Sequence, residues 1–146
     1  MSDPAFVLTS PNPFGLSDVG ADASPVLVDI DNDGDLDALV GNAAGNIQFF
    51  FFIGTVNNPI FTAPIANPFG LSAAVASASP AFVDIDDDGD LDALVGDAAG
   101  NTLFCQNIGT ASNPIFAAAI INPFGLSDVG SSASPTLVDI DGDGDL

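Results

Sequence analysis

The chain has 146 residues and a formal charge of −20, because it contains 20 acidic residues and no Lys, Arg or His. With 47% apolar residues it can build a core, so it is not a disordered acidic tail. No cationic side chain is present to neutralise phosphate, which excludes nucleic acid and anionic membranes as partners. The absence of the usual catalytic bases and nucleophile partners indicates a non-enzymatic protein.

The sequence repeats itself with a period of 55 residues. The segment Asn-Pro-Phe-Gly-Leu-Ser begins at Asn12, Asn67 and Asn122. A period near 50 residues is typical of propellers and repeat arrays. We therefore predict the end of a preceding repeat plus linker (1–23), a first full blade (24–78), a second full blade (79–133) and the truncated start of a third blade (134–146).

Each full unit is predicted to contain four strands and no helix. In the first unit the predicted strands are 25–30, 36–41, 46–53 and 60–65, with turns at 42–45 and 54–59. Gly45 supplies a positive φ for the first turn, and Pro59 suits the entrance of an edge strand. Apolar runs without alternation predict sheets that are covered on both faces. The fold class is therefore all-β, with tandem four-stranded antiparallel blades of about 55 residues in a β-propeller-like or open repeat array.

An acidic loop joins the first two predicted strands of each unit. Its carboxylates alternate along the chain, with a glycine after the third. They are Asp29, Asp31, Asp33, Asp35 and Asp37 in the first loop, Asp84, Asp86, Asp88, Asp90 and Asp92 in the second, and Asp139, Asp141, Asp143 and Asp145 in the third.

Such closely spaced carboxylates repel one another unless a cation lies between them, and the chain offers none of its own. Ca²⁺ takes about six to eight oxygens with flexible geometry, whereas Mg²⁺ demands a nearly ideal octahedron. We therefore predict Ca²⁺ as the ligand. The alternative is a solvated acidic turn without a metal.

Within the first loop, Asp29, Asp31 and Asp33 are expected to point inward, and Gly34 permits the sharp turn. Asp35 would offer its backbone carbonyl, and Asp37 would close the site. An EF-hand would place Glu at position twelve and continue as a helix, but this position is Val40 in a predicted strand. The loop is thus predicted to join two strands.

The segment from Ser24 to Gly41 resembles the FG-GAP/VCBS repeat of integrin-α-type β-propellers, as do Ala99 to Asn101 and Asn107 to Phe116. Phe14-Gly15, Phe69-Gly70 and Phe124-Gly125 correspond to the FG element of that family. The resemblance covers nearly the whole chain. It implies calcium sites in the acidic loops, and the third site would need a ninth-position ligand from elsewhere.

The two full units differ within their third predicted strand. Phe49 to Phe52 of the first unit stand where the second has Phe104, Cys105, Gln106 and Asn107. Phe51 and Phe52 are interpreted either as additional core packing or as an exposed apolar patch that docks a partner. Cys105 is expected to be a buried, inert thiol.

The sequence favours a calcium-stabilised structural protein of the cell surface or extracellular matrix. Its predicted partner is itself, in a filament or array, because strand edges at 4–8 and 134–140 are expected to be unpaired and the chain has no Lys or Glu to discourage pairing. The alternative is a closed β-propeller for adhesion or ligand binding, with other cell-surface proteins or glycans as partners. The extracellular location is inferred from calcium chemistry, since no signal peptide is visible, and no apolar run is long enough for membrane insertion.

Overall fold

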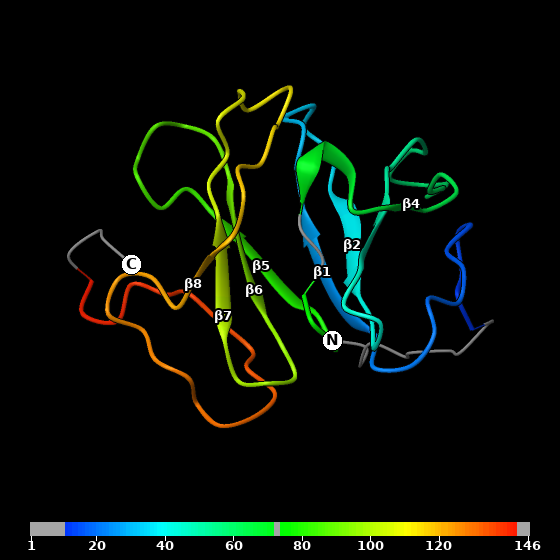
Figure 1. The fold of residues 1–146 in the computed structure, drawn as a ribbon. Helices are drawn as coiled ribbons and strands as arrows, with labels where there is room; N and C mark the ends of the chain where they lie inside the picture. Colours follow the sequence, from blue (N-terminus) through cyan, green and yellow to red (C-terminus); the bar gives the residue numbers. More distant parts are fainter. Residues whose placement is uncertain (1–10, 72–73, 143–146) are drawn as a thin grey trace, which may run out of the picture.

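The computed structural model describes residues 11–71 and 74–142, which form two four-stranded antiparallel sheets (Figure 1). Both sheets are simple meanders in which each strand pairs with the next along the chain. The strands are β1 Ser24–Val28, β2 Asp37–Gly41, β3 Ile47–Phe50 and β4 Ile65–Ala66, followed by β5 Ser79–Val83, β6 Asp92–Gly96, β7 Thr102–Cys105 and β8 Ile120–Ile121. The all-β prediction is confirmed. The described residues contain no helix that could cross a membrane.

The pairing register is the same in the two sheets. Leu39 of β2 lies opposite Val26 and Phe49, and its counterpart Leu94 of β6 lies opposite Ala81 and Phe104. The predicted turn at 42–45 connects β2 to β3, and Gly45 has the expected positive φ of 81°. Short-range turn chemistry therefore sets the same hairpin twice.

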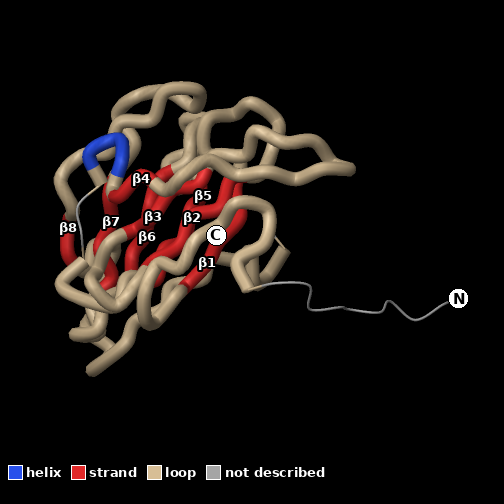
Figure 2. The backbone as a smooth tube through the Cα atoms, turned by 90° about the vertical axis from the view of Figure 1, so that its right-hand side faces the viewer, coloured by secondary structure: helices blue, strands red, loops and turns tan. Residues whose placement is uncertain are grey.

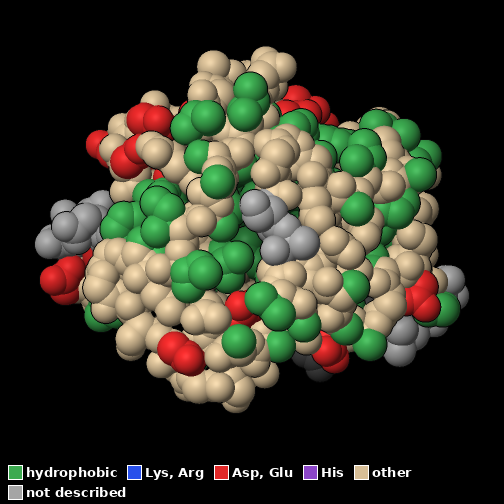
Figure 3. Space-filling model, viewed as in Figure 1, with side chains coloured by type: hydrophobic (Ala, Val, Ile, Leu, Met, Phe, Trp, Pro, Cys, Tyr) green, Lys and Arg blue, Asp and Glu red, His purple; other side chains and the backbone are tan. Residues whose placement is uncertain are grey.

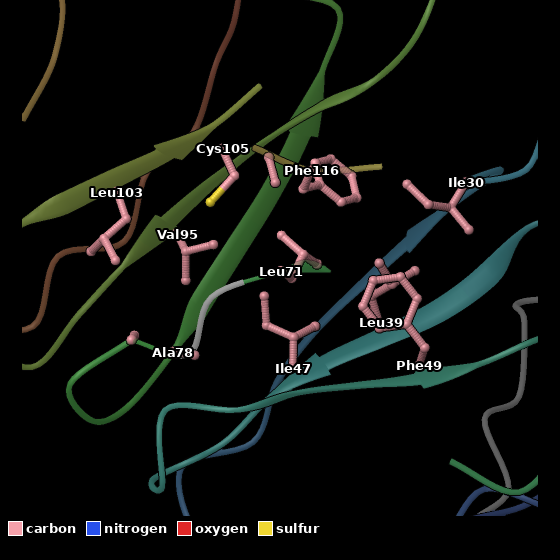
Figure 4. Packing of buried hydrophobic residues seen from close by; sticks show 12 residues of the cluster. Ile30, Leu39, Ile47, Phe49, Leu71, Ala78, Val95, Leu103, Cys105 and Phe116 are labelled. Atoms are coloured by element: carbon pink, nitrogen blue, oxygen red, sulfur yellow. The ribbon is translucent and has the colours of Figure 1, made fainter. Parts of the chain in front are cut away.

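The core lies between the two sheets, which stack one behind the other when the molecule is turned by 90° (Figure 2). Leu39 and Phe49 extend from the first sheet toward Val95 of the second, and Leu71 from the linker lies between them (Figure 4). Cys105 belongs to the same buried cluster, as predicted. The buried apolar core that stabilises the fold thus contains residues of both units.

Burial on both faces, which we predicted for the apolar strands, holds for β2 and β6 but not for β1. β6 is buried along its whole length, whereas Leu27 in β1 is 59% exposed. β5 packs against β1 and β2 of the first sheet, where Pro80 is buried, whereas Pro25 and Leu27 of β1 are exposed. The prediction for the first strand was therefore wrong.

The fourth strand is shorter and later than predicted. Instead of 60–65, only Ile65–Ala66 pairs as β4, and an isolated bridge joins Phe52 to Phe61. The Thr62 hydroxyl accepts the Phe51 N–H at 3.0 Å, which interrupts the regular ladder. Pro64 has no N–H to donate, so the ladder resumes only at Ile65. The same interruption ends β3 at Phe50 rather than at residue 53.

The Phe-Gly elements bind the outer segment of the following unit. The Phe14 carbonyl accepts the Phe61 N–H at 2.8 Å, and the Phe69 carbonyl accepts the Phe116 N–H at 2.8 Å. Phe69 lies in a short 3-10 turn, Pro68–Gly70, which was not predicted. Each linker is therefore hydrogen-bonded to the outer segment of the unit that follows it.

Backbone hydrogen bonds join each sheet to the chain that follows it. The Asn42 carbonyl accepts the Ala78 N–H, and the Asp97 carbonyl accepts the Ala133 N–H, both at 3.0 Å. A row of hydroxyl contacts runs beside them, from Ser24 to Ser79 at 3.2 Å and from Ser79 to Ser134 at 3.0 Å. Residues 134–142 form no strand. The proposed unit boundaries at 24, 79 and 134 stay a prediction, and the expected edge at 4–8 lies outside the described residues.

Candidate metal centre

The acidic loops lie between the first two strands of each sheet. The first loop connects β1 to β2, and the second connects β5 to β6. Seen over the surface, carboxylates form separate groups among apolar and neutral side chains (Figure 3). The charge is therefore concentrated at defined places.

Each loop is closed by hydrogen bonds from its own backbone to its first carboxylate. Asp29 Oδ1 accepts the Asp33 N–H at 3.0 Å, and Asp29 Oδ2 accepts the Gly34 N–H at 2.9 Å. Asp33 Oδ1 in turn accepts the Asp35 N–H at 2.9 Å. Gly34 has a φ of 96°, a conformation that L side chains rarely adopt. The turn therefore requires glycine at this place.

The second loop repeats these bonds with nearly the same lengths. Asp84 accepts the N–H groups of Asp88 and Gly89 at 3.1 and 2.9 Å, and Asp88 accepts the Asp90 N–H at 3.1 Å. Two copies of the repeat thus fold into one loop geometry. This agreement shows that the alternating carboxylates and the glycine determine the loop.

Three carboxylates of each loop converge. One oxygen each from Asp29, Asp31 and Asp33 lies within 4.8 Å of the other two, and the same is true of Asp84, Asp86 and Asp88. Oxygens that share one Ca²⁺ ion each lie about 2.3–2.6 Å from it, so they can be no more than about 5 Å apart. These residues therefore fit a calcium ion by distance and by donor type.

The ninth position of each loop is buried at the start of the second strand. Asp37 is 2% exposed and Asp92 is 1% exposed. Asp37 Oδ1 accepts the Phe52 N–H at 2.7 Å, and Asp92 Oδ1 accepts the Asn107 N–H at 2.7 Å. Asp37 Oδ2 is buried without any hydrogen-bond partner, as is Asp31 Oδ1. A buried carboxylate oxygen without a donor is costly, and a bound cation would satisfy it.

The electrostatics of the loops follow from this crowding. Burial raises the pKa of Asp37 to about 6, and the neighbouring charges of Asp31 and Asp33 add to the effect, while the Phe52 N–H opposes it. Burial also raises the pKa of Asp92 and of Asp31, in the latter case with the charge of Asp33 contributing. In the second loop, burial and then the charge of Asp88 raise the pKa of Asp90.

These shifts predict how the metal-free protein responds to pH. A raised pKa means that the folded state binds the proton more tightly than the unfolded state, in which Asp has a pKa near 3.8. Stability should therefore fall as pH rises from about 4 through about 6, and the full loss should be present above that pKa. Thermal melts of decalcified protein between these values test this, with Asp37→Asn as the variant that should flatten the profile. A metal-free melting temperature that rises over the same range would contradict it.

Not every predicted ligand joins the converging groups. Asp35, Asp37, Asp90 and Asp92 lie outside the two sets of three carboxylates. Asp37 and Asp92 instead contact the end of the third strand through one oxygen each. In the third loop, Asp139 Oδ1 accepts the Gly142 N–H at 2.6 Å, while Asp143 and Asp145 lie outside the described residues.

The structure adds one polar contact that sequence reasoning missed. Gln106 Nε2 donates to Asp86 Oδ2 at 2.8 Å. Its counterpart Phe51 packs against Phe69 with ring centroids 6.1 Å apart, and Phe52 packs against Phe61 at 5.4 Å. The aromatic run thus adds packing, which is one of the two interpretations given above. The signal for Gln106 was present in the difference between the repeats.

A family model described as the FG-GAP-like repeat matches residues 29–95. The match begins at the first residue of the first acidic loop and extends through the second loop into β6. This segment is similar to an FG-GAP-like repeat. The resemblance seen in the sequence is therefore confirmed. No curated protein and no solved structure matched the chain.

Proposed function

We propose that this FG-GAP-like chain is a non-enzymatic, calcium-stabilised repeat protein of the cell surface or extracellular matrix. The single observation that supports it best is Asp37 Oδ2, an oxygen that is buried without a partner beside converging carboxylates. The chain has no Lys, Arg or His that could supply the missing positive charge. FG-GAP-like repeats often bind calcium, which agrees with this donor set.

Calcium would act in this protein as part of the fold. The loop oxygens would coordinate the ion and remove the repulsion within the β1–β2 and β5–β6 connections. Ca²⁺ is abundant outside cells, and this supports the extracellular location. FG-GAP-like repeats are generally non-enzymatic, and the missing His, Lys, Arg and Tyr support the same conclusion here.

We further propose that copies of the chain associate head to tail. The residues on both sides of the contact between the two sheets belong to the repeat. Each side of this contact therefore has a counterpart in the other repeat. Pro80 of β5 is buried against the first sheet, whereas its counterpart Pro25 in β1 is exposed. The turn after β6 carries the same carbonyl contact as the turn after β2. A heterologous contact of this kind forms a filament when it does not close and a ring when it does.

Light scattering coupled to size exclusion, in millimolar calcium and in EGTA, tests this association. Open-ended assembly in calcium is the expected result, because calcium would screen the acidic loops as copies approach. A discrete ring would favour the alternative, a closed β-propeller that binds other cell-surface proteins or glycans, for which the FG-GAP-like match is the supporting observation. A monodisperse monomer in calcium would remove the proposal of self-assembly.

A further inference from the structure

The second acidic loop has a supporting side chain that the first lacks. Gln106 follows β7 directly, and its amide Nε2 donates to Asp86 Oδ2 at 2.8 Å. Asp86 is one of the three converging carboxylates of this loop. The corresponding residue of the first unit is Phe51, whose ring packs against Phe49 and Phe69 and has no donor for Asp31. The two loops therefore share a backbone geometry but differ in what holds their third-position carboxylate.

The neighbour of Gln106 fixes the chain at this point. Asn107 is only 3% exposed, and its Oδ1 accepts the N–H groups of Gly109 and Ile115 at 3.0 and 2.9 Å. The Gln106 carbonyl accepts the Ala117 N–H at 2.8 Å. In the first unit Phe52 replaces Asn107 and keeps only the backbone bond to the loop. Gln106 thus extends from a backbone that is held on both sides.

A donor to a ligating carboxylate affects metal binding in two ways. It restrains the side chain in its binding orientation before the ion arrives, and it occupies one oxygen so that the other is directed to the ion. Removing such a partner typically weakens metal affinity by about 10- to 100-fold. In the first loop Asp31 Oδ1 is buried with no hydrogen-bond partner, and the residue at the place of Gln106 is Phe51, which has no side-chain donor.

We propose that Gln106 is a positioning residue for Asp86 and that it makes the second loop the tighter of the two calcium sites. The inference rests on the proposed calcium function. It predicts sequential filling, in which the loop of residues 84–92 is occupied first and the loop of residues 29–37 follows. The two loops therefore differ in calcium affinity although their sequences repeat.

Titration of the metal-free full chain with CaCl₂, followed by NMR, tests this at each loop separately. Gly34 and Gly89 are the reporters, because each donates its N–H to the first carboxylate of its own loop. Gly89 should respond at a calcium concentration about tenfold lower than Gly34. Gln106→Ala should raise the midpoint of Gly89 about tenfold or more and leave that of Gly34 unchanged.

Gln48→Ala is the matched control, since Gln48 lies in β3 and pairs with Val40 and Ala66, away from both loops. It should move neither midpoint. Gln106 is exposed, so the variant should fold, and its melting temperature in saturating calcium verifies that. Equal midpoints in the wild type, or an unchanged Gly89 midpoint in Gln106→Ala, would overturn the inference while leaving calcium binding intact. If neither glycine responds to calcium, the proposed function fails and the inference fails with it.

Discussion

Chelating calcium should lower the melting temperature by on the order of 10–20 °C. A ligand that binds only the folded state contributes about 2.7 kcal/mol per site when its concentration is 100 times Kd. Two occupied loops would thus contribute about 5 kcal/mol, and a chain of this size shifts by about 2–4 °C for each kcal/mol. The physical cause is the repulsion among the three converging carboxylates of each loop, to which the first loop adds the unpartnered oxygens of Asp31 and Asp37.

Circular dichroism melts in millimolar calcium and in EGTA measure this shift. Replacing Asp31 and Asp86 together by Ala should lower the melting temperature in calcium and make it insensitive to EGTA. Asp18 provides the control, because its carboxylate only accepts the Gly20 N–H on an exposed linker. Asp18→Ala should retain the full response to EGTA. An identical melt with and without calcium would show that the loops are acidic turns without a structural metal.

Gly41→Ala should destabilise the protein by about 3 kcal/mol or more, because overpacking a closely packed contact is costly. A Cβ at this position would overlap the Ala78 carbonyl group and contact the Pro80 ring. These atoms belong to the junction between the two sheets, where the backbone contacts of Ala78 leave it no room to move. The same crowding occurs where Gly96 meets Ala133 and Pro135, so Gly96→Ala should have a similar effect.

Gly20→Ala is the comparison that separates crowding from backbone strain. Gly20 has a φ of 94°, but no atom lies within 4 Å of the place that a Cβ would take, so the substitution introduces strain without a clash. Its cost should be about 1–2 kcal/mol. Urea denaturation of the three variants in calcium gives the free energies of unfolding. If Gly41→Ala is no more destabilising than Gly20→Ala, the sheets do not meet as closely as described.

The parts of the fold that the sequence predicts are those set by local chemistry. The acidic loop, the turn at 42–45 and the pairing of β1, β2 and β3 depend on residues that are near one another in the chain. The fourth strand depends on more distant residues. The Thr62 hydroxyl accepts the Phe51 N–H, and the Phe61 N–H donates to the Phe14 carbonyl. A hydrogen bond from a backbone N–H to a side chain leaves no periodic pattern in the sequence, so the apolar run predicted too long a strand.

The candidate site also combines features set by residues close in sequence with features set by tertiary contacts. The carboxylates that converge are close together in sequence, and their spacing alone predicts that they face one ion. The contact between Gln106 and Asp86 joins residues 20 positions apart in the chain, so it depends on the tertiary arrangement. The exposure of Leu27 also depends on tertiary packing, since only the position of a neighbouring sheet decides which apolar strand is covered.

The ion stoichiometry of the purified chain tests most directly whether the acidic loops bind calcium. Equilibrium dialysis of the wild type, followed by elemental analysis, should find calcium bound in each of the loops 29–37 and 84–92. The Asp31→Ala variant should bind one ion fewer and the Asp31→Ala, Asp86→Ala double variant two fewer, with both proteins still folded in the assay. Wild-type protein that retains no calcium after dialysis against millimolar CaCl₂ would contradict the account.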